Sequence, residues 1–333
     1  MGFDSSRGGV PPAYRLDGPA DAASDPPARA TLSSMTFRGD AQFDTTRVAR
    51  RGGGARGGAI AIGGGGLVTV LLFIVSSFLG VDLTGLGSAI QQDPSAGGGS
   101  DTEVVGCTGE QANDPASYDC RMEGGADSLS AYWSGVFAEN SLEYREPAVV
   151  LYGGQVSTAC GNASSAVGPF YCPGDEQIYV DTTFFDTLRT QFGASGGSLS
   201  QLYVLGHEWG HHIQQLTGDL QRVDAQDTGP SGSATRSELQ ADCYAGAWLA
   251  AASTTPDQGG GDPVLVQPTQ AELNDALDAA AAIGDDSIQA QSGQGVNPDS
   301  WTHGSSEQRQ TWFANGYQQG VSACANVWQV PTP

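Results

Sequence analysis

Two histidines four residues apart, with a glutamate directly after the first, restrict how one segment of this chain can fold. The sequence H-E-W-G-H occupies residues 207–211, in a run typical of a helix. Residues four apart share one face of a helix, so both imidazoles can bind one metal ion while Glu208 reaches a water molecule on it. The pattern also occurs by chance, but this segment and the adjacent His212 hold three of the chain's 4 histidines. We therefore predict that His207 and His211 are ligands of one zinc ion.

The third ligand has to come from another part of the chain, because a catalytic zinc takes three protein ligands and keeps one position open. Glu238 lies in S-E-L-Q-A-D, residues 237–242, on the next long predicted helix. Asp242 follows one helical turn later and could accept the free ring N–H of a ligand histidine. The alternative is an exposed carboxylate pair, which the apolar neighbours Tyr244 and Trp248 disfavour. We predict Glu238 as the third ligand and Asp242 as its supporting acid.

The same residues predict a reaction class. With zinc held by two histidines and a glutamate, Glu208 would act as general base on the metal-bound water and pass the proton to a leaving amine. The mechanism also needs a donor for the developing oxyanion. His303, in W-T-H-G at residues 301–304, is the candidate. The alternative for His303 is a capping role ahead of the helix that we expect from Ser305. The chemistry indicated is amide hydrolysis.

Four further polar residues near these motifs have two interpretations each. His212 is rotated off the ligand face and is expected beside the site or at the surface. Tyr203 and Tyr244 are either donors to the substrate or core residues. Arg309 is expected to pair with Glu307 or with an acid on a helix rather than to touch substrate.

The segment from Ala59 to Val81 contains no charged residue and is long enough to cross a bilayer as a helix. Several arginines precede it, and no basic residue follows before Arg121. By the positive-inside rule, the N-terminus would be cytoplasmic and the rest exported. A buried helix and a cleaved signal peptide are the alternatives, but the preceding stretch is too long for a signal peptide. We predict a single-pass membrane protein with an extracytoplasmic domain.

Composition around this segment divides the chain. Residues 1–58 are rich in Gly, Pro, Ala, Asp and Arg without an apolar period, so we expect a disordered cytoplasmic tail. Residues 82–105 are rich in Gly, Ser and Gln and are expected to form a flexible linker. The remaining part, 106–329, is predicted to be the folded domain.

The chain has 6 cysteines, and all of them follow the uncharged segment. This distribution is typical of an oxidising compartment. Short spacing favours two pairs, Cys107 with Cys120 and Cys160 with Cys172, which leaves Cys243 with Cys324. Free buried thiols are the alternative, and Cys243 could also be a soft metal ligand, although a disulfide is the better interpretation.

The acidic balance limits the partners. The formal net charge is −23, and all 14 basic residues are arginine. An anionic surface repels phosphate backbones, so we expect no nucleic-acid partner. The expected partners are a peptide or protein substrate and the membrane, through Ala59 to Val81. The sequence does not indicate the oligomeric state.

Periodicity predicts an α+β, helix-rich domain with a small sheet. Two short strands are expected at 147–152 and 177–181, with a rigid Gly/Pro connection at 168–173 between them. The motif helix, 198–217, should stop at Gly218. The other expected helices are 128–140, 182–192, 233–253, 269–283 and 305–320.

Several separated motifs together resemble the bacterial, membrane-anchored predicted neutral zinc metallopeptidases. They are M-T-F-R-G at 35–39, C-G at 160–161, G-P-F-Y-C-P at 168–173, H-E-W-G-H at 207–211, E-L-Q-A-D-C-Y-A-G at 238–246 and T-H-G-S-S-E-Q-R at 302–309. The wider resemblance is to gluzincins, whose third ligand is a Glu with an acid four residues later. It implies a gluzincin-like peptidase fold with one zinc ion. Trp209 departs from the family, which more often has a small or aliphatic residue there, and we expect it to pack.

The expected function is therefore a membrane-anchored zinc peptidase that cleaves peptides or envelope proteins outside the cytoplasm. One alternative is a catalytically silent ectodomain that serves as a binding scaffold and uses zinc structurally. Retention of Glu208 argues against it, as does the lack of a fourth Cys or His ligand at helical spacing. A second alternative is an amidase acting on cell-wall peptides, which no motif distinguishes.

Overall fold

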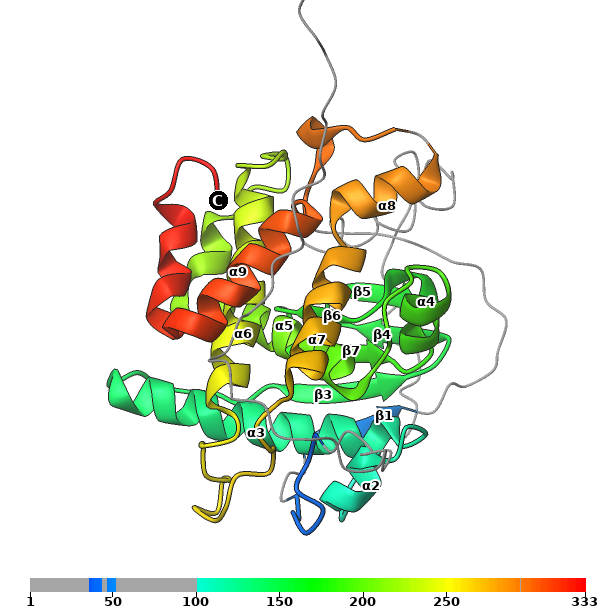
Figure 1. The fold of residues 1–333 in the computed structure, drawn as a ribbon, viewed down its shortest axis with the longest axis vertical. Helices are drawn as coiled ribbons and strands as arrows, with labels where there is room; N and C mark the ends of the chain where they lie inside the picture. The colour runs from blue at the N-terminus through cyan, green and yellow to red at the C-terminus, as the bar shows by residue number, and fades with distance from the viewer. Residues whose placement is uncertain (1–35, 44–46, 52–100, 294) are drawn as a thin grey trace, which may run out of the picture.

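The computed structural model describes residues 36–43, 47–51, 101–293 and 295–333, which form a helix-rich α+β domain with a small sheet (Figure 1). The strands are β1 Val48–Arg51, β2 Asp101–Glu103, β3 Ala148–Tyr152, β4 Gln155–Thr158, β5 Gly161–Ser164, β6 Phe170–Cys172 and β7 Gln177–Asp181. The α-helices are α2 Gly109–Asn113, α3 Tyr118–Glu139, α4 Phe184–Thr190, α5 Ser198–Thr217, α6 Ser233–Ala251, α7 Gln270–Ala282, α8 Asp285–Ser292 and α9 Ser306–Gln319. Short 3₁₀ turns are η2 Ser165–Val167, η3 Asp219–Arg222, η4 Pro298–Ser300 and η5 Val321–Trp328. The helix-rich α+β class with a small sheet matches the prediction.

The main sheet has five strands in the order β2-β1-β3-β7-β6. Its three central strands are parallel, and the two edge strands run antiparallel to them. Along β3, Val149 and Leu151 face a core shared with the helices, whereas Val150 and Tyr152 face a second core under the β4–β5 hairpin. Both faces are thus covered, which explains why β3 is an uninterrupted apolar run.

One strand of this sheet comes from the segment that we expected to be a disordered tail. In β1, Val48 is fully buried and the strand pairs in parallel with β3, from Val48 opposite Val149 to Arg50 opposite Leu151. Its other side pairs with β2, where Arg51 lies opposite Asp101. The prediction of disorder for residues 1–58 is therefore wrong at 47–51, and the linker predicted at 82–105 contains β2. The domain includes strands from both sides of the segment 52–100.

A second N-terminal segment, residues 36–43, packs on the domain as well. Phe37 is fully buried, and the backbone around it pairs with residues 264–266. Asn113 holds Phe37 through two hydrogen bonds with its backbone, of 3.0 and 2.8 Å. Gly124 on α3 allows the rings of Phe37 and Phe43 to come close, because a Cβ at this position would lie 2.5–2.6 Å from them. This part of the predicted tail is also ordered.

The motif helix α5 lies at the centre of the helical layer. It contacts α3, α6 and α7, and in Figure 1 it lies between the strands and the pair α6 and α9. It ends at Gly218, whose φ of 83° places it in the left-handed conformation that stops a helix. The bounds of α5 and its stop agree with the prediction.

The other predicted elements agree with the structure within a few residues, except for one helix and one connection. The predicted helix 128–140 is the second half of the longer α3. The segment 168–173, expected as a rigid connection, contains the edge strand β6. The predicted disulfides Cys107–Cys120, Cys160–Cys172 and Cys243–Cys324 are all formed, so no cysteine is free or available as a ligand.

The predicted membrane helix, Ala59 to Val81, lies outside the described residues, as does most of the predicted tail and linker. Within the described ranges, no helix has both the length and the apolar character needed to cross a membrane.

Candidate functional site

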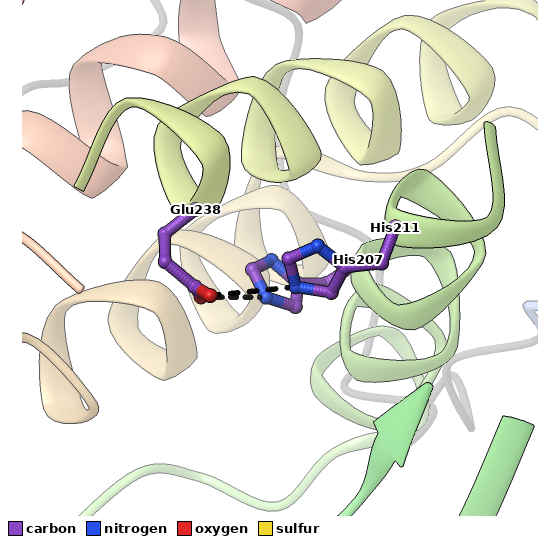
Figure 2. A group of neighbouring side chains, drawn as sticks. All are labelled: His207, His211 and Glu238. Carbon is purple, nitrogen blue, oxygen red and sulfur yellow. Dashed lines mark hydrogen bonds and ion pairs between the residues drawn. The ribbon is translucent and has the colours of Figure 1, made fainter. Parts of the chain in front are cut away.

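Two neighbouring helices carry the predicted metal ligands. His207 and His211 project from α5 and Glu238 from α6 (Figure 2). Gly210, inside the histidine motif, makes their close approach possible: a Cβ there would lie 3.0 Å from the backbone oxygen of Ala241 on α6. The glycine between the histidines therefore helps to bring the third ligand within reach of the first two.

The three side chains converge on one point. Their candidate ligand atoms all lie within 4.8 Å of one another. Glu238 Oε2 is 3.2 Å from His207 Nε2, and its Oε1 is 3.5 Å from His211 Nε2. Tetrahedral zinc with bonds of about 2.0–2.1 Å holds its ligand atoms about 3.3 Å apart, so this donor set fits zinc. Two imidazoles and one carboxylate are also a ligand set of catalytic rather than structural zinc sites.

Asp242 sets the orientation of the first ligand. Its Oδ1 lies 2.8 Å from His207 Nδ1, which leaves Nε2 directed at the convergence point. Burial alone would lower the pKa of His207, but the carboxylates of Asp242 and Glu238 outweigh it and raise the pKa to about 10. Binding of a metal ion at Nε2 would therefore displace a proton. The contact supports the predicted role of Asp242 in fixing the His207 tautomer.

Asp242 is itself held by Arg309 and Tyr203, and all three side chains are fully or almost fully buried. Arg309 Nε donates to Asp242 Oδ2 at 2.8 Å and Nη2 donates to Oδ1 at 3.0 Å, while the Tyr203 hydroxyl donates to Oδ1 at 2.5 Å. Burial would raise the pKa of Asp242, but Arg309 and His207 hold it below its usual value. Arg309 thus pairs with a helix acid, one of its two predicted partners.

The second ligand is oriented by a residue that the sequence analysis did not identify. His211 Nδ1 lies 2.9 Å from Gln214 Oε1, three residues further along α5. Gln214 in turn donates to the backbone oxygen of Ser237 on α6 at 2.6 Å. Spacing of three residues on a helix could have indicated Gln214 from the sequence.

Glu208 is 5 % exposed and its Oε2 has no hydrogen-bond partner among the described residues. Burial raises the pKa of this carboxyl, while the two ligand histidines oppose the rise. A buried carboxylate oxygen without a donor is unfavourable for folding alone, and such atoms are common where a group is reserved for chemistry. Its position agrees with that of a general base.

His303 reaches the same region from the loop before α9. Its Nδ1 lies 3.1 Å from Asp285 Oδ1, and its buried Nε2 has no hydrogen-bond partner in the described part of the chain. Asp285 Oδ2 accepts the backbone N–H groups of Thr302, His303 and Gly304 at 2.7–3.1 Å. The helix cap is Ser305, whose side chain accepts from Gln308 N, so the capping interpretation of His303 is wrong.

Asp285 was not predicted, and nothing in the local sequence indicates it. It begins α8 and meets His303 only because α8 and the loop before α9 fold against each other. Burial would raise the pKa of His303's partner Asp285, but His303 outweighs this and lowers it. The His303 pKa, which burial alone would lower, is raised by Asp285 and Glu238.

A cavity of about 310 Å³ joins these groups. His207, Glu208, Glu238, His303 and Arg309 line one part of it. Glu208, His303 and two of the three predicted metal ligands, His207 and Glu238, therefore adjoin a common space.

The remaining candidates have structural positions. His212 is buried off the ligand face, between the hydroxyl of Tyr171 and the backbone oxygen of Arg145. Tyr244 packs edge-on against Trp133 in the core and does not line the cavity. Trp209 is fully buried, so the expectation that it packs is confirmed.

The chain is similar to uncharacterised proteins of other bacteria. The chain is 48% identical over 213 residues to the uncharacterised protein Rv2575 of Mycobacterium tuberculosis (strain ATCC 25618 / H37Rv), covering 64% of this chain and 71% of the relative. It is 36% identical over 269 residues to the uncharacterised protein YpfJ of Escherichia coli (strain K12), covering 79% and 86%. No solved structure matches the chain.

A family model described as "Putative neutral zinc metallopeptidase" matches residues 35–328. The match includes the first described segment, the five-stranded sheet and every residue of the site above. Zinc, implied by this family, is the ion that the two histidines and the glutamate fit. The chain belongs to the family of putative neutral zinc metallopeptidases.

Proposed function

We propose that this protein is a zinc-dependent peptidase that hydrolyses peptide bonds in the cavity beside His207, His211 and Glu238. The observation that carries the proposal is the convergence of three zinc-type donors within 4.8 Å, beside a buried carboxylate oxygen that lacks a partner. Family membership supports the same reaction class. A gluzincin-like arrangement is part of the proposal, because a glutamate on a second helix supplies the third ligand.

His207, His211 and Glu238 would hold the metal. When bound, zinc would supply a Lewis acid that polarises a carbonyl group and makes water more acidic. Asp242 and Gln214 would keep the two imidazoles in the tautomers that bind it, since each accepts a ring N–H.

Glu208 would move the proton. Its raised pKa makes the carboxylate a better base at neutral pH than an exposed glutamate. In hydrolysis it would accept a proton from the attacking water and deliver it to the amine that leaves. The other two carboxylates of the site already have partners. Asp242 contacts His207 and Arg309, and Glu238 contacts both ligand histidines.

His303 would donate a hydrogen bond to the substrate carbonyl oxygen as negative charge develops there. Its Nε2 is free and buried, and Asp285 stabilises the positive ring by accepting from Nδ1. The raised pKa of His303 favours the protonated, donating form.

A catalytically silent scaffold is the competing function. A structural zinc site is normally closed by a fourth Cys or His ligand. In the described part of the chain only three residues form the metal-binding group, and all cysteines are in disulfides. These observations favour catalysis, as does the cavity that reaches the ligands.

The proposed location is outside the cytoplasm, with attachment to a membrane through Ala59 to Val81. Three disulfides support an oxidising compartment. The pairing of β1 with β3 changes one part of the expectation, because strand partners occupy the same compartment. We therefore place residues 36–43 and 47–51 with the catalytic domain instead of in the cytoplasm, and we drop the expectation that Ala59 to Val81 crosses the membrane once.

Chelation and reconstitution of the full chain test the proposed activity. Zinc-loaded protein is incubated with a mixed peptide library, and the products are identified by mass spectrometry. A chelator should abolish cleavage, and added zinc should restore it. Cleavage that persists after complete metal removal, or no cleavage by protein with one zinc per chain, would contradict the proposal.

A further inference from the structure

The cavity beside the metal ligands is polar at one end and apolar over most of its remaining wall. The residues assigned above form the polar end, and Ser165, Thr187 and Gln191 are further polar residues of the lining. The apolar wall comes from four different parts of the chain: Val167, Pro169, Phe184, Phe192, Val204 and Ile283. A substrate held at the metal ligands would therefore place one of its side chains against this wall.

Val204 links the wall to the site most directly. It lies on α5, three residues before His207 and four before Glu208, so the three share one face of the helix. Val204 is 5 % exposed and lines the cavity. A side chain that enters the cavity beside Glu208 would therefore come close to Val204.

Ile283, another residue of the apolar wall, is connected to the metal site through Arg309. Ile283 caps α7 at its C-terminus, and its backbone oxygen accepts a hydrogen bond from Arg309 Nη1 at 3.3 Å. Arg309 is the residue that fixes Asp242. The position of Ile283 is thereby tied to that of the metal site.

Two aromatic residues and a glycine also belong to the lining of the cavity. Phe184 begins α4 and Phe192 lies two residues after its end, and both are only half-buried although they are large and apolar. Gly168 has a φ of 76°, and a Cβ on it would lie 3.3 Å from the Phe184 ring. A side chain at position 168 would press on that ring, so glycine preserves the space in front of it.

The apolar wall defined above contains no charged residue. The titratable groups in the described lining are His207, Glu208, Glu238, His303, Arg309 and the hydroxyl of Tyr203. The Tyr203 hydroxyl donates a hydrogen bond to Asp242. Burying an unpaired charge costs several kcal/mol, so carboxylate and ammonium side chains are disfavoured there. Apolar cavities of about 150 Å³ already accept a benzene ring. A volume of about 310 Å³ therefore has room for a large side chain with part of a backbone.

We propose that this cavity selects substrates with a bulky apolar side chain, such as that of Leu, Met or Phe, at one of the two residues flanking the cleaved bond. This inference rests on the proposed peptidase function and names its substrate class. It also argues against cell-wall peptides as the substrate, because their side chains are mainly methyl, carboxylate and amine groups that do not fill an apolar cavity.

The first test uses zinc-loaded full-length protein and blocked peptides that are randomised at the two residues flanking a central bond. Cleavage should be at least about 10-fold faster with Leu, Met or Phe at one flanking position than with Asp, Glu or Lys there. Val204→Ala should enlarge the cavity and raise the rate ratio of Phe over Val substrates by roughly 10-fold. The control is Ile213→Val, on the same helix but outside the cavity, which should leave the ratio unchanged.

The second test separates selection from catalysis. Peptide hydroxamates with an isobutyl or a carboxymethyl side chain are titrated against zinc-loaded Glu208→Gln protein. The isobutyl compound should bind more tightly, by about 10-fold or more, and Val204→Ala in this background should reduce the difference.

The outcomes distinguish the two proposals. No cleavage together with selective hydroxamate binding would overturn the peptidase function and keep the cavity assignment. Cleavage without a flanking preference, or with a preference that Val204→Ala does not alter, would overturn the cavity assignment alone.

Discussion

His207 Nδ1 lies 2.8 Å from Asp242 Oδ1, and this one contact links the metal ligand to a buried network of Arg309 and Tyr203. The histidine sits on α5 and the acid on α6, so the contact also joins the two ligand-bearing helices. The imidazole orientation is therefore set by the packing of the helices and not by the metal alone.

Asp242→Asn should weaken zinc binding by roughly 10- to 100-fold, because an amide oxygen is a weaker acceptor for the His207 N–H and no longer offsets Arg309. Competition against a zinc chelator measures the change. Asp186→Asn, which alters an exposed acid paired with Arg189, is the matched control and should bind zinc like the wild type. Equal affinity for all three proteins would show that Asp242 does not orient the ligand.

Glu123 should make stability depend on pH. This α3 residue is fully buried; its Oε2 accepts from Cys107 N, and burial raises its pKa from 4.5 to about 7. Between these values the folded protein holds a proton that the unfolded chain has released, so the free energy of unfolding falls as pH rises from 4.5 to about 7.

Glu123→Gln removes the titrating group and should flatten that part of the pH profile, measured as Tm on chelator-treated protein. Glu139→Gln, exposed on the same helix, serves as the control and should keep the wild-type profile. If Glu123→Gln and wild type lose stability in parallel across this window, another group is responsible.

Phe37→Ala should destabilise the protein by about 3–5 kcal/mol, because a fully buried aromatic ring is lost from between α3 and residues 264–266. Denaturant unfolding of the metal-free protein measures this. Leu142→Ala changes an apolar residue that is 54 % exposed and should stay within about 0.5 kcal/mol of wild type. A Phe37→Ala effect as small as that of Leu142→Ala would mean that residues 36–43 do not pack on the domain in solution.

The sheet pairing predicts that both sides of the segment 52–100 share a compartment. Asp40→Cys and Glu139→Cys each place one thiol on an exposed position, in a chain whose natural cysteines are all in disulfides. In intact cells a membrane-impermeant maleimide should label both variants or neither. Labelling of Glu139→Cys alone would restore the original expectation that residues 1–58 are cytoplasmic.

The convergence of His207, His211 and Glu238 could be predicted because each part of the pattern is local in sequence. His207, Glu208 and His211 are spaced by helix geometry, and Glu238 and Asp242 repeat one turn on the next long helix. The two disulfides with short spacing could be predicted for the same reason. Asp242 could be assigned because a histidine that binds a metal usually donates its other ring N–H to a carboxylate.

Other features depend on tertiary packing and have no local signal. β1, with the sequence VARR, has two arginines and no alternating pattern, and it becomes a strand because β3 and β2 offer it hydrogen bonds. Asp285 begins a short polar helix and acquires a role only where it meets His303. The Gly210 approach to Ala241 likewise appears only when α5 and α6 are placed together.

Zinc content and peptide turnover, measured side by side in wild type, Glu208→Gln and Glu238→Gln, test the central claim most directly. Wild type and Glu208→Gln should each hold one zinc per chain, while Glu208→Gln should lose turnover by roughly 100- to 10,000-fold because the proton acceptor is gone. Glu238→Gln should lose zinc and turnover together. A Glu208→Gln protein that keeps its zinc and cleaves peptides at the wild-type rate would contradict the account.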